Sequence, residues 1–586
     1  MKRWKSRVVY VGKVAVGGDN PIRIQSMTTS NTRDVVATVE QIMRLADYGC
    51  EIARVTVQGM KEADACEGIK NTLVQRGYDI PLVADIHFYP PAAMRVVDFV
   101  DKVRVNPGNF VDKRATFKTL TYDTASYQAE LDRIEEKFSP LVEKCKKLKR
   151  SMRIGTNHGS LSDRIMNYYG DTPRGMVESA FEFLRVCIKM NYHDVIFSMK
   201  ASNPIVMIEA YRLLVTEMMK EGWDYPLHLG VTEAGEGEDG RIKSAVGIGT
   251  LLLDGIGETI RVSLTEDPWE EIEPCKELIS WASSYKERDP APFQPVRAPK
   301  IAPPLHRDGS VLLYITQEQL KEPNFLDQIG CSALQKRKDA PDALIIEEWP
   351  GELPVMESIR RHNIGLITRT PGVAGTIWLQ ERKTFTPTSQ SYALDVQPGE
   401  EIKGLDPQFV IFHGSTHQGR TFFAQGIDCP VILASEAPLI KASAEMGALL
   451  TDKCGDGLAL PLSKRLFGFA LLQASRMRTS RTEFISCPGC GRTLFNLQDV
   501  ARRIREKTSH LPGVKIAIMG CIVNGPGEMA DADFGYVGSK PGKIDLYVGK
   551  ERVEADIDHA EADERLIELI KKHGRWIEPN VELVTI

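Results

Sequence analysis

The sequence lacks any uninterrupted apolar run of about 18 residues, the length that a helix needs to cross a bilayer. Its opening, MKRWKSRVVYVGKVAVGG, has basic side chains but neither a continuous apolar core nor a small-residue cleavage site. We therefore expect no membrane-spanning helix and no secretory signal peptide. The sequence predicts a soluble, cytoplasmic protein.

The chain also has little net charge, because 74 Lys and Arg stand against 79 Asp and Glu, which gives −5 at neutral pH. This balance gives no reason to expect nucleic acid or a membrane as a partner. Any anionic ligand must instead be bound by a local cluster of cations. The 586 residues, 42% hydrophobic and 26% charged, are typical of a globular protein with two or three domains.

Cysteine is scarce, with eleven in the whole chain. Eight of them are widely separated and are expected to be buried, reduced thiols. These eight are Cys50, Cys66, Cys145, Cys187, Cys275, Cys331, Cys429 and Cys454. The other three lie together near the C-terminus and need a separate explanation.

Short β-branched runs alternate with amphipathic segments over about the first 265 residues, a length typical of one barrel. The strand-like runs are 21–27, 51–57, 81–87, 101–108, 151–157, 194–200, 225–232 and 258–264. A strand followed by a helix, repeated eight times, predicts a closed parallel TIM (β/α)8 barrel over residues 1–285. Residues 111–150, rich in Lys and Glu, lengthen the connection after the fourth strand.

The rest of the chain divides into three parts. Residues 286–304 are rich in proline, which breaks both periodicities, so we interpret them as a linker. Residues 305–480 are predicted to form an inserted α/β domain that resembles part of a second barrel. Residues 481–586 are predicted to form an α+β domain.

Polar residues occupy alternate positions in the predicted barrel strands. Arg54 and Thr56 alternate with valines in one strand, and Arg104 and Asn106 do so in another. Because alternate residues of a strand face the same side, one face of these strands is aliphatic and the other is polar and basic.

Five strands each place a cation on this polar face, namely Arg54, Arg104, Arg153, Lys200 and Arg261. One such residue alone would be explained as a satisfied core side chain, but five unpaired buried charges are costly. They predict a multiply charged anion, such as a diphosphate, at the C-terminal ends of the strands. Further candidates for ligand binding are Asp85, His87, Asn106, Asn157, Ser202, Asn203 and His228.

Glu233 directly follows the seventh predicted strand, in HLGVTEAG. An acid among cations can deliver a proton to a bound substrate. The alternative for Glu233 is a simple ion pair with a neighbouring arginine.

The three clustered cysteines are Cys487, Cys490 and Cys521, and Glu528 follows seven residues after the last. A zinc ribbon would need a second C-x2-C about 15–20 residues after the first, and none is present. Three thiolates with one other ligand suit a [4Fe–4S] cluster whose fourth iron can bind substrate. On these residues alone, zinc and chance clustering stay open.

Motifs in both terminal parts of the chain carry a family resemblance. They are PIRIQSMTTSNTRD, RVTV, PLVADIHF, RVNPGN, HLGVTEAG, SCPGCGRT and MGCIVNGPGE. Together they resemble (E)-4-hydroxy-3-methylbut-2-enyl diphosphate synthase of the methylerythritol phosphate pathway to isoprenoids. The middle of the chain is similar to the inserted domain of this family's long, three-domain form.

The resemblance implies a [4Fe–4S] cluster in a domain similar to those of sulfite and nitrite reductases, with the ligands Cys487, Cys490, Cys521 and Glu528. It implies 2-C-methyl-D-erythritol 2,4-cyclodiphosphate as the substrate, whose ring is opened with loss of water by two electrons delivered singly from flavodoxin or ferredoxin. It also implies Glu233 as a candidate proton donor. The implied diphosphate-binding residues are Arg54, Arg104, Arg153, Lys200 and Ser263.

Two other functions are open on the sequence. One is a zinc-binding regulatory protein with an inactive barrel, and the other is a redox-neutral barrel aldolase or synthase with a structural cluster. No GxGxxG fingerprint follows a predicted strand, so no flavin or nicotinamide is expected to supply electrons. The oligomeric state is expected to be a monomer or a homodimer.

The inserted domain shows no comparable set of cations at its predicted strand ends. Its nearest polar segment, HGSTHQGR at 413–420, is interpreted as a surface loop. We therefore interpret the inserted domain as a spacer that lets the cluster domain reach the barrel of the same chain.

Replacing Cys487, Cys490 or Cys521 with Ser is expected to abolish cluster binding and activity, because water cannot replace a lost thiolate without loosening the cluster. The measurement is iron per chain and visible absorption after anaerobic purification. Full iron content in any of the three variants would contradict the assignment.

Overall fold

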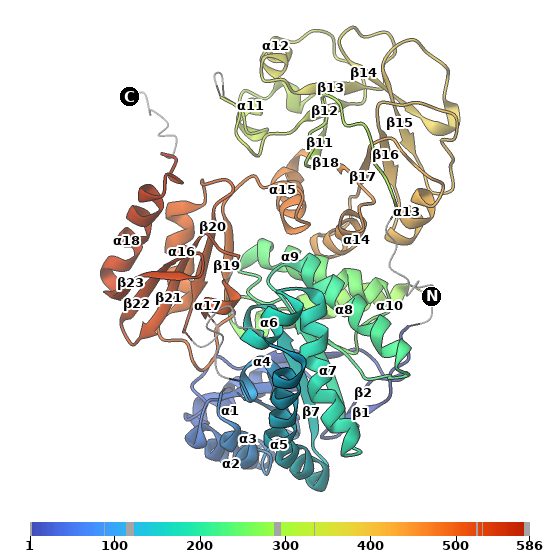
Figure 1. Ribbon diagram of the computed structural model, residues 1–586. Helices are drawn as coiled ribbons and strands as arrows, with labels where there is room; N and C mark the ends of the chain where they lie inside the picture. The colour runs from blue at the N-terminus through green and yellow to red at the C-terminus, as the bar shows by residue number, and fades with distance from the viewer. Residues whose placement is uncertain are drawn as a thin grey trace. The chain divides into compact units, whose positions relative to one another are not determined.

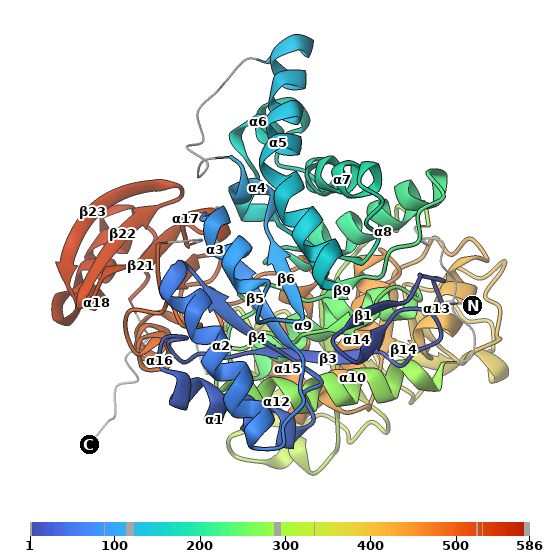
Figure 2. The same cartoon turned by 90° about the horizontal axis from the view of Figure 1, so that it is seen from below.

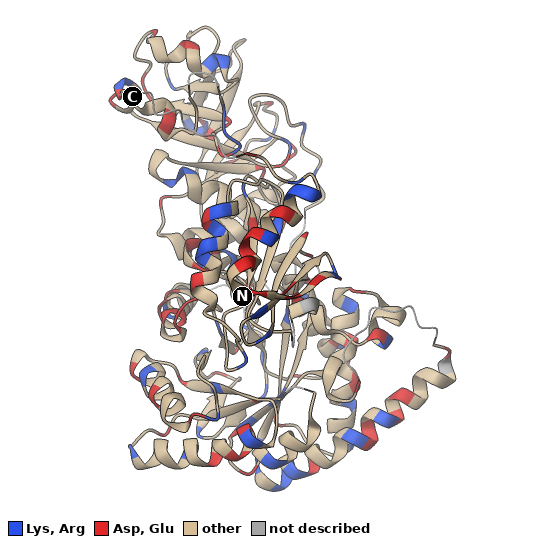
Figure 3. Ribbon diagram, turned by 90° about the vertical axis from the view of Figure 1, so that its left-hand side faces the viewer, with Lys and Arg blue, Asp and Glu red and all other residues tan. Residues whose placement is uncertain are grey.

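A computed structural model describes residues 3–86, 88–112, 122–285, 295–332, 335–522, 525–529 and 531–578. The chain forms two compact units, Met1–Pro290 together with Thr482–Ile586, and Ala291–Arg481 (Figure 1). Among the described helices, none combines the length and apolarity that a membrane crossing requires. Lys and Arg are interspersed with Asp and Glu along the helices, in keeping with the small net charge (Figure 3).

The first unit contains a parallel sheet of eight strands. They are β3 (Arg23–Met27), β4 (Ile52–Val57), β5 (Leu82–Ile86), β6 (Lys102–Val105), β7 (Ser151–Asn157), β8 (Val195–Lys200), β9 (His228–Leu229) and β10 (Thr259–Ile260). Their order is β8-β7-β6-β5-β4-β3-β10-β9, and a parallel bridge between Phe197 and Leu227 joins the two ends. The predicted TIM barrel is confirmed.

Two of the predicted strands are shorter than expected. The runs 225–232 and 258–264 contain only the two-residue strands β9 and β10. Hydrogen bonds from Arg261 N to Leu229 O (3.0 Å) and from Thr232 N to Ala201 O (3.1 Å) continue the contacts beyond them. The barrel therefore stays connected where the regular ladder ends.

Helices surround these strands (Figure 2). They are α1 (Val35–Tyr48), α2 (Met60–Gln75), α3 (Pro90–Val96), α4 (Pro107–Phe110), α5 (Thr124–Leu148), α6 (Asp163–Tyr169), α7 (Pro173–Lys189), α8 (Pro204–Lys220), α9 (Gly237–Leu253) and α10 (Ile272–Ser284), with the short 3-10 turns η1 (His158–Ser160) and η2 (Pro268–Glu271). Helix α5 belongs to the Lys/Glu-rich extension, of which residues 113–121 lie outside the described residues.

Helix α1 shows how the sequence fixes these elements. The side chain of Asp34 caps its start by accepting a hydrogen bond from Ala37 N, and Gly49 ends it in the left-handed region with φ 103°. Val39 and Ile42, spaced for one helical face, are fully or almost fully buried. Capping thus sets the length of α1, and its apolar face binds it to the barrel.

An N-terminal hairpin covers the interior of the barrel at the N-terminal ends of its strands. Strands β1 (Val9–Val11) and β2 (Val14–Val16) pair antiparallel, and their valines form one apolar cluster with Ile52, Val83 and Ile196. This plug leaves the C-terminal ends of the barrel strands as the open end.

The second unit is a complete closed barrel rather than part of one. Its strands are β11 (Ser310–Ile315), β12 (Ala343–Ile346), β13 (Gly365–Thr368), β14 (Ile377–Glu381), β15 (Tyr392–Val396), β16 (Val410–His413), β17 (Val431–Ala434) and β18 (Gly457–Pro461). Its helical segments are η3 (Gln319–Lys321), α11 (Phe325–Gln328), α12 (Pro354–Arg361), η4 (Arg382–Thr384), α13 (Thr416–Phe423), α14 (Leu439–Thr451), η5 (Leu462–Lys464) and α15 (Arg465–Ala474).

Two expectations for this unit were wrong. It was expected to resemble only part of a barrel, because prolines, glycines and polar residues flank the short apolar stretches of β14, β15 and β18 and hide them as strands. The segment 413–420 is not a surface loop, because it contains the end of β16 and most of α13. Ser415 and Gln418 form a capping box that begins this helix.

The C-terminal domain of the first unit has a five-stranded mixed sheet. Its strands are β19 (Glu483–Ser486), β20 (Lys515–Met519), β21 (Phe534–Lys540), β22 (Lys543–Val548) and β23 (Glu551–Asp558), and its helices are α16 (Leu497–Thr508), α17 (Gly525–Glu528) and α18 (His559–Lys572). The first three strands are parallel and the last two pair antiparallel. Apolar residues of α16 and α18 share one core on the same side of the sheet.

None of the eleven cysteines forms a disulfide, and of the eight scattered ones all but the half-buried Cys429 are buried. Burial raises the pKa of Cys50 and Cys66 to about 12, so these thiols stay protonated. The prediction of reduced core thiols is confirmed for the seven buried ones.

Candidate functional site

A cleft at the open end of the barrel brings the predicted cations together. The cleft has about 760 Å³ of space not filled by atoms. The cations that line it, here called the cation ring, are Arg54 on β4, Arg104 on β6, Arg153 on β7, Lys200 on β8 and Arg261 just after β10. All five side chains are buried.

Carboxylates balance only part of this charge. Within the described residues, Asp85 pairs with Arg104 at 3.0 Å and Glu271 pairs with Arg261 at 2.8 Å, and the other three cations have no ion pair. Arg153, which is 1% exposed, has two guanidinium nitrogens without a hydrogen-bond partner in the described part of the chain. The ring therefore lacks an anion.

The pKa values of the cation ring also indicate that negative charge is missing there. Burial, together with Arg261 and Arg104, lowers the pKa of Arg54 to about 10. Burial and the neighbouring arginines lower the pKa of Arg153 and Lys200 well below their usual ranges. Because arginine stays protonated in proteins, an anion that binds here would relieve this repulsion.

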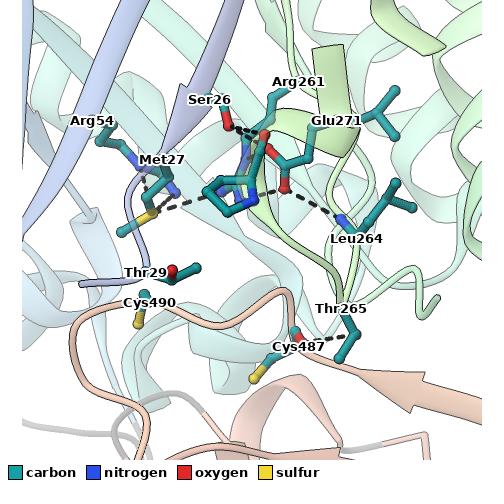
Figure 4. Close-up of polar contacts among 12 residues, drawn as sticks. Ser26, Met27, Thr29, Arg54, Arg261, Leu264, Thr265, Glu271, Cys487 and Cys490 are labelled. Carbon is teal, nitrogen blue, oxygen red and sulfur yellow. Dashed lines mark hydrogen bonds and ion pairs between the residues drawn. The ribbon is translucent and has the colours of Figure 1, made fainter. Parts of the chain in front are cut away.

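A small network holds two members of the ring in place (Figure 4). Arg54 donates from Nε and Nη2 to the Met27 sulfur at 3.1 and 2.8 Å. Arg261 donates from Nε and Nη2 to the two carboxylate oxygens of Glu271, each at 2.8 Å. Glu271 also accepts a hydrogen bond from Ser26 Oγ at 2.6 Å. A thioether is a weak acceptor, so Met27 orients Arg54 without neutralising it.

The other substrate-binding candidates divide into two groups. Asp85, Asn157 and Ser263 line the cleft. The four candidates that do not line it are Asn106, Ser202, Asn203 and His228, and His87 lies outside the described residues.

Asn106 and Asn203 are structural caps: their side chains accept hydrogen bonds from Gly108 N and Ile205 N at the starts of α4 and α8. His228 is fully buried and contacts Thr259 Oγ1 at 2.6 Å. The alternation of polar residues along a strand identifies residues at the strand ends. It does not distinguish a residue that caps the next helix from one that contacts a ligand.

The C-terminal domain contributes a second set of residues to the same cleft. Cys487 follows β19, Cys490 lies in the same turn, Cys521 follows β20, and Glu528 ends α17. Burial, together with the nearby Cys521 and Cys490, raises the pKa of Cys487 to about 12. The thiols are thus close enough to repel one another as anions, and bound metal would reverse this effect.

The donor set of these residues fits an iron–sulfur cluster. Cysteine thiolates are the side chains that hold such clusters. Cys487, Cys490 and Cys521 line the cleft together with the Glu528 carboxylate, which is available as a ligand of another type.

Two carboxyl groups meet where the barrel and the C-terminal domain come together. Glu528 accepts hydrogen bonds from Asn157 Nδ2 (2.6 Å) and Thr232 Oγ1 (3.3 Å). Burial and the nearby Glu528 carboxyl raise the pKa of Glu233 well above its usual range, which favours its protonated form. Glu233 also has φ 49°, a strained conformation of the kind found at functional sites.

The barrel and the C-terminal domain are in direct contact at this cleft. Thr265 Oγ1 donates to Cys487 O at 2.9 Å, and Lys243 pairs with Glu483 at 3.1 Å. A Cβ added to Gly159 would lie 2.3 Å from the carbonyl oxygen of Gly527. Two glycines therefore allow the two backbones to touch beside Glu528.

Sequence reasoning missed several residues of the cleft. They include Met27, Thr232, Arg492, Thr493 and Met519. Arg492 had an available signal, because it follows Cys490 by two positions in a turn already assigned to the cluster. Met27 had no such signal in the sequence, because most barrel strands contain apolar residues of this kind.

Known proteins match both parts of the first unit. Residues 6–276 match a family model described as the GcpE TIM-barrel domain, and residues 483–572 match one described as the GcpE protein C-terminal domain. The 4-hydroxy-3-methylbut-2-en-1-yl diphosphate synthase (flavodoxin) of Protochlamydia amoebophila (strain UWE25) is 57% identical over 99% of this chain and 97% of its own length. The chain belongs to the 4-hydroxy-3-methylbut-2-en-1-yl diphosphate synthase family.

Other relatives extend this match across bacteria and plants. The chloroplastic (ferredoxin) synthase of Arabidopsis thaliana is 49% identical over 99% of this chain and 88% of its own length. The (flavodoxin) synthase of Chlamydia muridarum (strain MoPn / Nigg) is 46% identical over 98% of each. The family resemblance is thus confirmed, and the chain is an enzyme of this family.

Replacing Gly159 with Ala is expected to lower turnover by about 100-fold, because the new methyl group would push Gly527 and Glu528 away from the barrel mouth. Iron content should stay at the wild-type level. The matched control is Gly68→Ala in α2, where a Cβ meets its nearest atom at an ordinary 3.5 Å. Wild-type turnover in Gly159→Ala would show that this close approach is unnecessary.

Proposed function

We propose that the enzyme opens the ring of 2-C-methyl-D-erythritol 2,4-cyclodiphosphate reductively and forms (E)-4-hydroxy-3-methylbut-2-enyl diphosphate and water. The observation that carries this proposal is one cleft lined both by the cation ring and by three cysteines with Glu528. The names of the relatives give a diphosphate of this skeleton as the product and flavodoxin or ferredoxin as the electron donor.

In this proposal the cation ring binds the diphosphate. Arg54, Arg153 and Lys200 line the cleft and form no ion pair with a carboxylate of the described residues. Arg104 and Ser263 line the same cleft and add hydrogen-bond donors. A guanidinium binds two phosphate oxygens at once, so the arginines fix orientation as well as charge.

A [4Fe–4S] cluster would be held by Cys487, Cys490, Cys521 and Glu528, and when bound it supplies electrons one at a time. The cleft is also lined by Gly520, where a Cβ would lie 2.8 Å from Thr493 Cγ2, so this glycine lets the turn that contains Cys490 pack against the segment that leads to Cys521. Asn157 and Thr232 of the barrel hold the Glu528 carboxylate, so the barrel takes part in orienting this ligand.

The proposed reaction requires a proton as well as electrons. The cyclodiphosphate dianion takes up two electrons and one proton, a ring C–O bond and a C–OH bond break, a C=C bond forms, and a diphosphate trianion and water leave. Glu233 lines the cleft and its environment favours the protonated form, so we assign it the proton that departs in the water.

Anaerobic turnover tests the function directly. Enzyme with cyclodiphosphate and reduced flavodoxin or ferredoxin should form the product with two electrons consumed per molecule. A matched reaction without the donor should form none, and turnover there would favour a redox-neutral synthase. Purified protein that contains zinc and has no absorption near about 400 nm would favour a zinc-binding regulatory protein, because zinc has no redox chemistry of its own.

Glu233→Gln is expected to lower turnover by about 10²–10⁴-fold with little change in substrate affinity, because the amide fits the site but cannot give up a proton. The measurement is kcat and KM for the cyclodiphosphate, with the same reduced electron donor for both enzymes. Unchanged kcat would remove Glu233 from the chemistry.

We further propose that residues 1–285 bind substrate, that residues 481–586 hold the cluster, and that residues 305–480, after a linker at 286–304, act as a spacer. The first unit supports this division, because one chain contributes both Asn157 and Glu528 to the cleft. The second barrel supports it too. Arg369, directly after β13, is paired with the carboxylates of Glu347 and Asp395, so its charge is balanced within the protein and is not left for an anion as in the cation ring.

A further inference from the structure

Arg492 is a cation that the C-terminal domain places in the cleft of the barrel. It follows Cys490 and Gly491 in the cysteine-containing turn, and it lines the cleft together with the cation ring. Neither the barrel motifs nor the cluster ligands account for it.

The two ends of the Arg492 guanidinium have different surroundings. Nε donates to the Cys490 sulfur at 3.2 Å. Nη1 is shielded from solvent and has no hydrogen-bond partner among the described residues. One nitrogen thus contacts a cluster ligand, and another is available to a ligand in the cleft.

The position of Arg492 is fixed by the backbone beside it. A Cβ on Gly491 would lie 2.6 Å from Ser30 O and 2.7 Å from Thr56 Oγ1, so the turn is seated directly on the barrel. Only a glycine permits this approach. Arg492 therefore lines the cleft because the C-terminal domain packs directly on the barrel.

Closure brings this cation close to others of the same sign. Arg492 is one of the charges that lower the pKa of Arg54, after burial and the other ring arginines. This repulsion between Arg54 and Arg492 is unfavourable in itself, whatever the other neighbours of Arg492 contribute. A bound diphosphate would remove that cost, and the closed form would then be favoured.

Resting on the proposed function, we propose that Arg492 is a substrate-binding residue supplied by the cluster domain. Its Nη1 edge binds the diphosphate and its Nε bonds the Cys490 sulfur. One cation is thereby shared between substrate and cluster ligand, so that diphosphate binding draws the cluster domain onto the barrel. A positive charge and a hydrogen bond at a ligand sulfur also favour the reduced cluster.

The test compares three variants as anaerobically purified holoenzyme. Arg492→Gln removes the charge, and Arg492→Lys keeps it without the planar fork. Arg503→Gln is the control, because Arg503 lies on α16 of the same domain and pairs with Asp563 at 3.0 Å rather than lining the cleft. Iron content is measured for each variant.

The first readout is binding of the cyclodiphosphate to the oxidised enzyme by calorimetry, where no turnover occurs. Arg492→Gln should weaken binding by about tenfold to 100-fold, the range for a lost hydrogen bond to a charged group. Arg492→Lys should lose about threefold to tenfold, and Arg503→Gln should match wild type. Wild-type affinity in Arg492→Gln overturns the proposal.

The second readout is the midpoint potential of the cluster without substrate, followed by electron paramagnetic resonance. Arg492→Gln should lower it, by 59 mV if electron affinity falls tenfold, and Arg492→Lys should stay near wild type. An unchanged potential in Arg492→Gln overturns the assigned bond to Cys490. If Arg492→Gln loses iron, the affinity of Arg492→Lys for the cyclodiphosphate tests the proposal instead. Wild-type affinity in Arg492→Lys would then overturn the proposal.

These outcomes are distinct from failure of the proposed function. If wild-type enzyme lacks a cluster or does not bind the cyclodiphosphate, the function itself is wrong. If wild type has both properties and Arg492→Gln shares them unchanged, only the role of Arg492 is wrong.

Discussion

Positive charge that the protein does not itself neutralise is the constraint on which the rest of this structure depends. Buried cations destabilise a fold unless something balances them. Here two of the five ring cations have carboxylates within the described residues, and one rests on a thioether. The barrel places these side chains together because each of them lies on a strand or directly after one. Part of the fold's stability is thus exchanged for affinity toward an anion.

The domain contact follows from the same constraint. Glu233 lies near the Glu528 carboxyl, which helps to raise its pKa, and Arg492 lies beside the cysteines, so the two domains place acids, thiols and a cation within one cleft. Neither domain contains this set alone. The proposed reaction, which needs both a proton and electrons, therefore requires the two domains together.

The sequence predicted the first barrel well because β-branched runs recur eight times in it with helix-length segments between most of them. It predicted the second barrel only in part, since β14, β15 and β18 lie among prolines and glycines that obscure the period. For the site, strand parity identified Arg54, Arg104, Arg153, Lys200 and Arg261, which all line the cleft. It also selected Asn106 and Asn203, because a helix cap and a ligand contact place the same residue type after a strand. Contacts such as Met27 with Arg54 depend on side-chain geometry that no periodicity encodes.

The touching backbones of Gly159 and Gly527 have an evolutionary consequence. A side chain at either position would collide with the other, since the added Cβ would lie 2.3 Å or 1.7 Å from a carbonyl oxygen. The two positions belong to different domains and are far apart in the gene, yet they constrain each other as if adjacent. Recombination that exchanges one domain between distant relatives would therefore succeed only where both partners keep these glycines, so the two domains are expected to be inherited together.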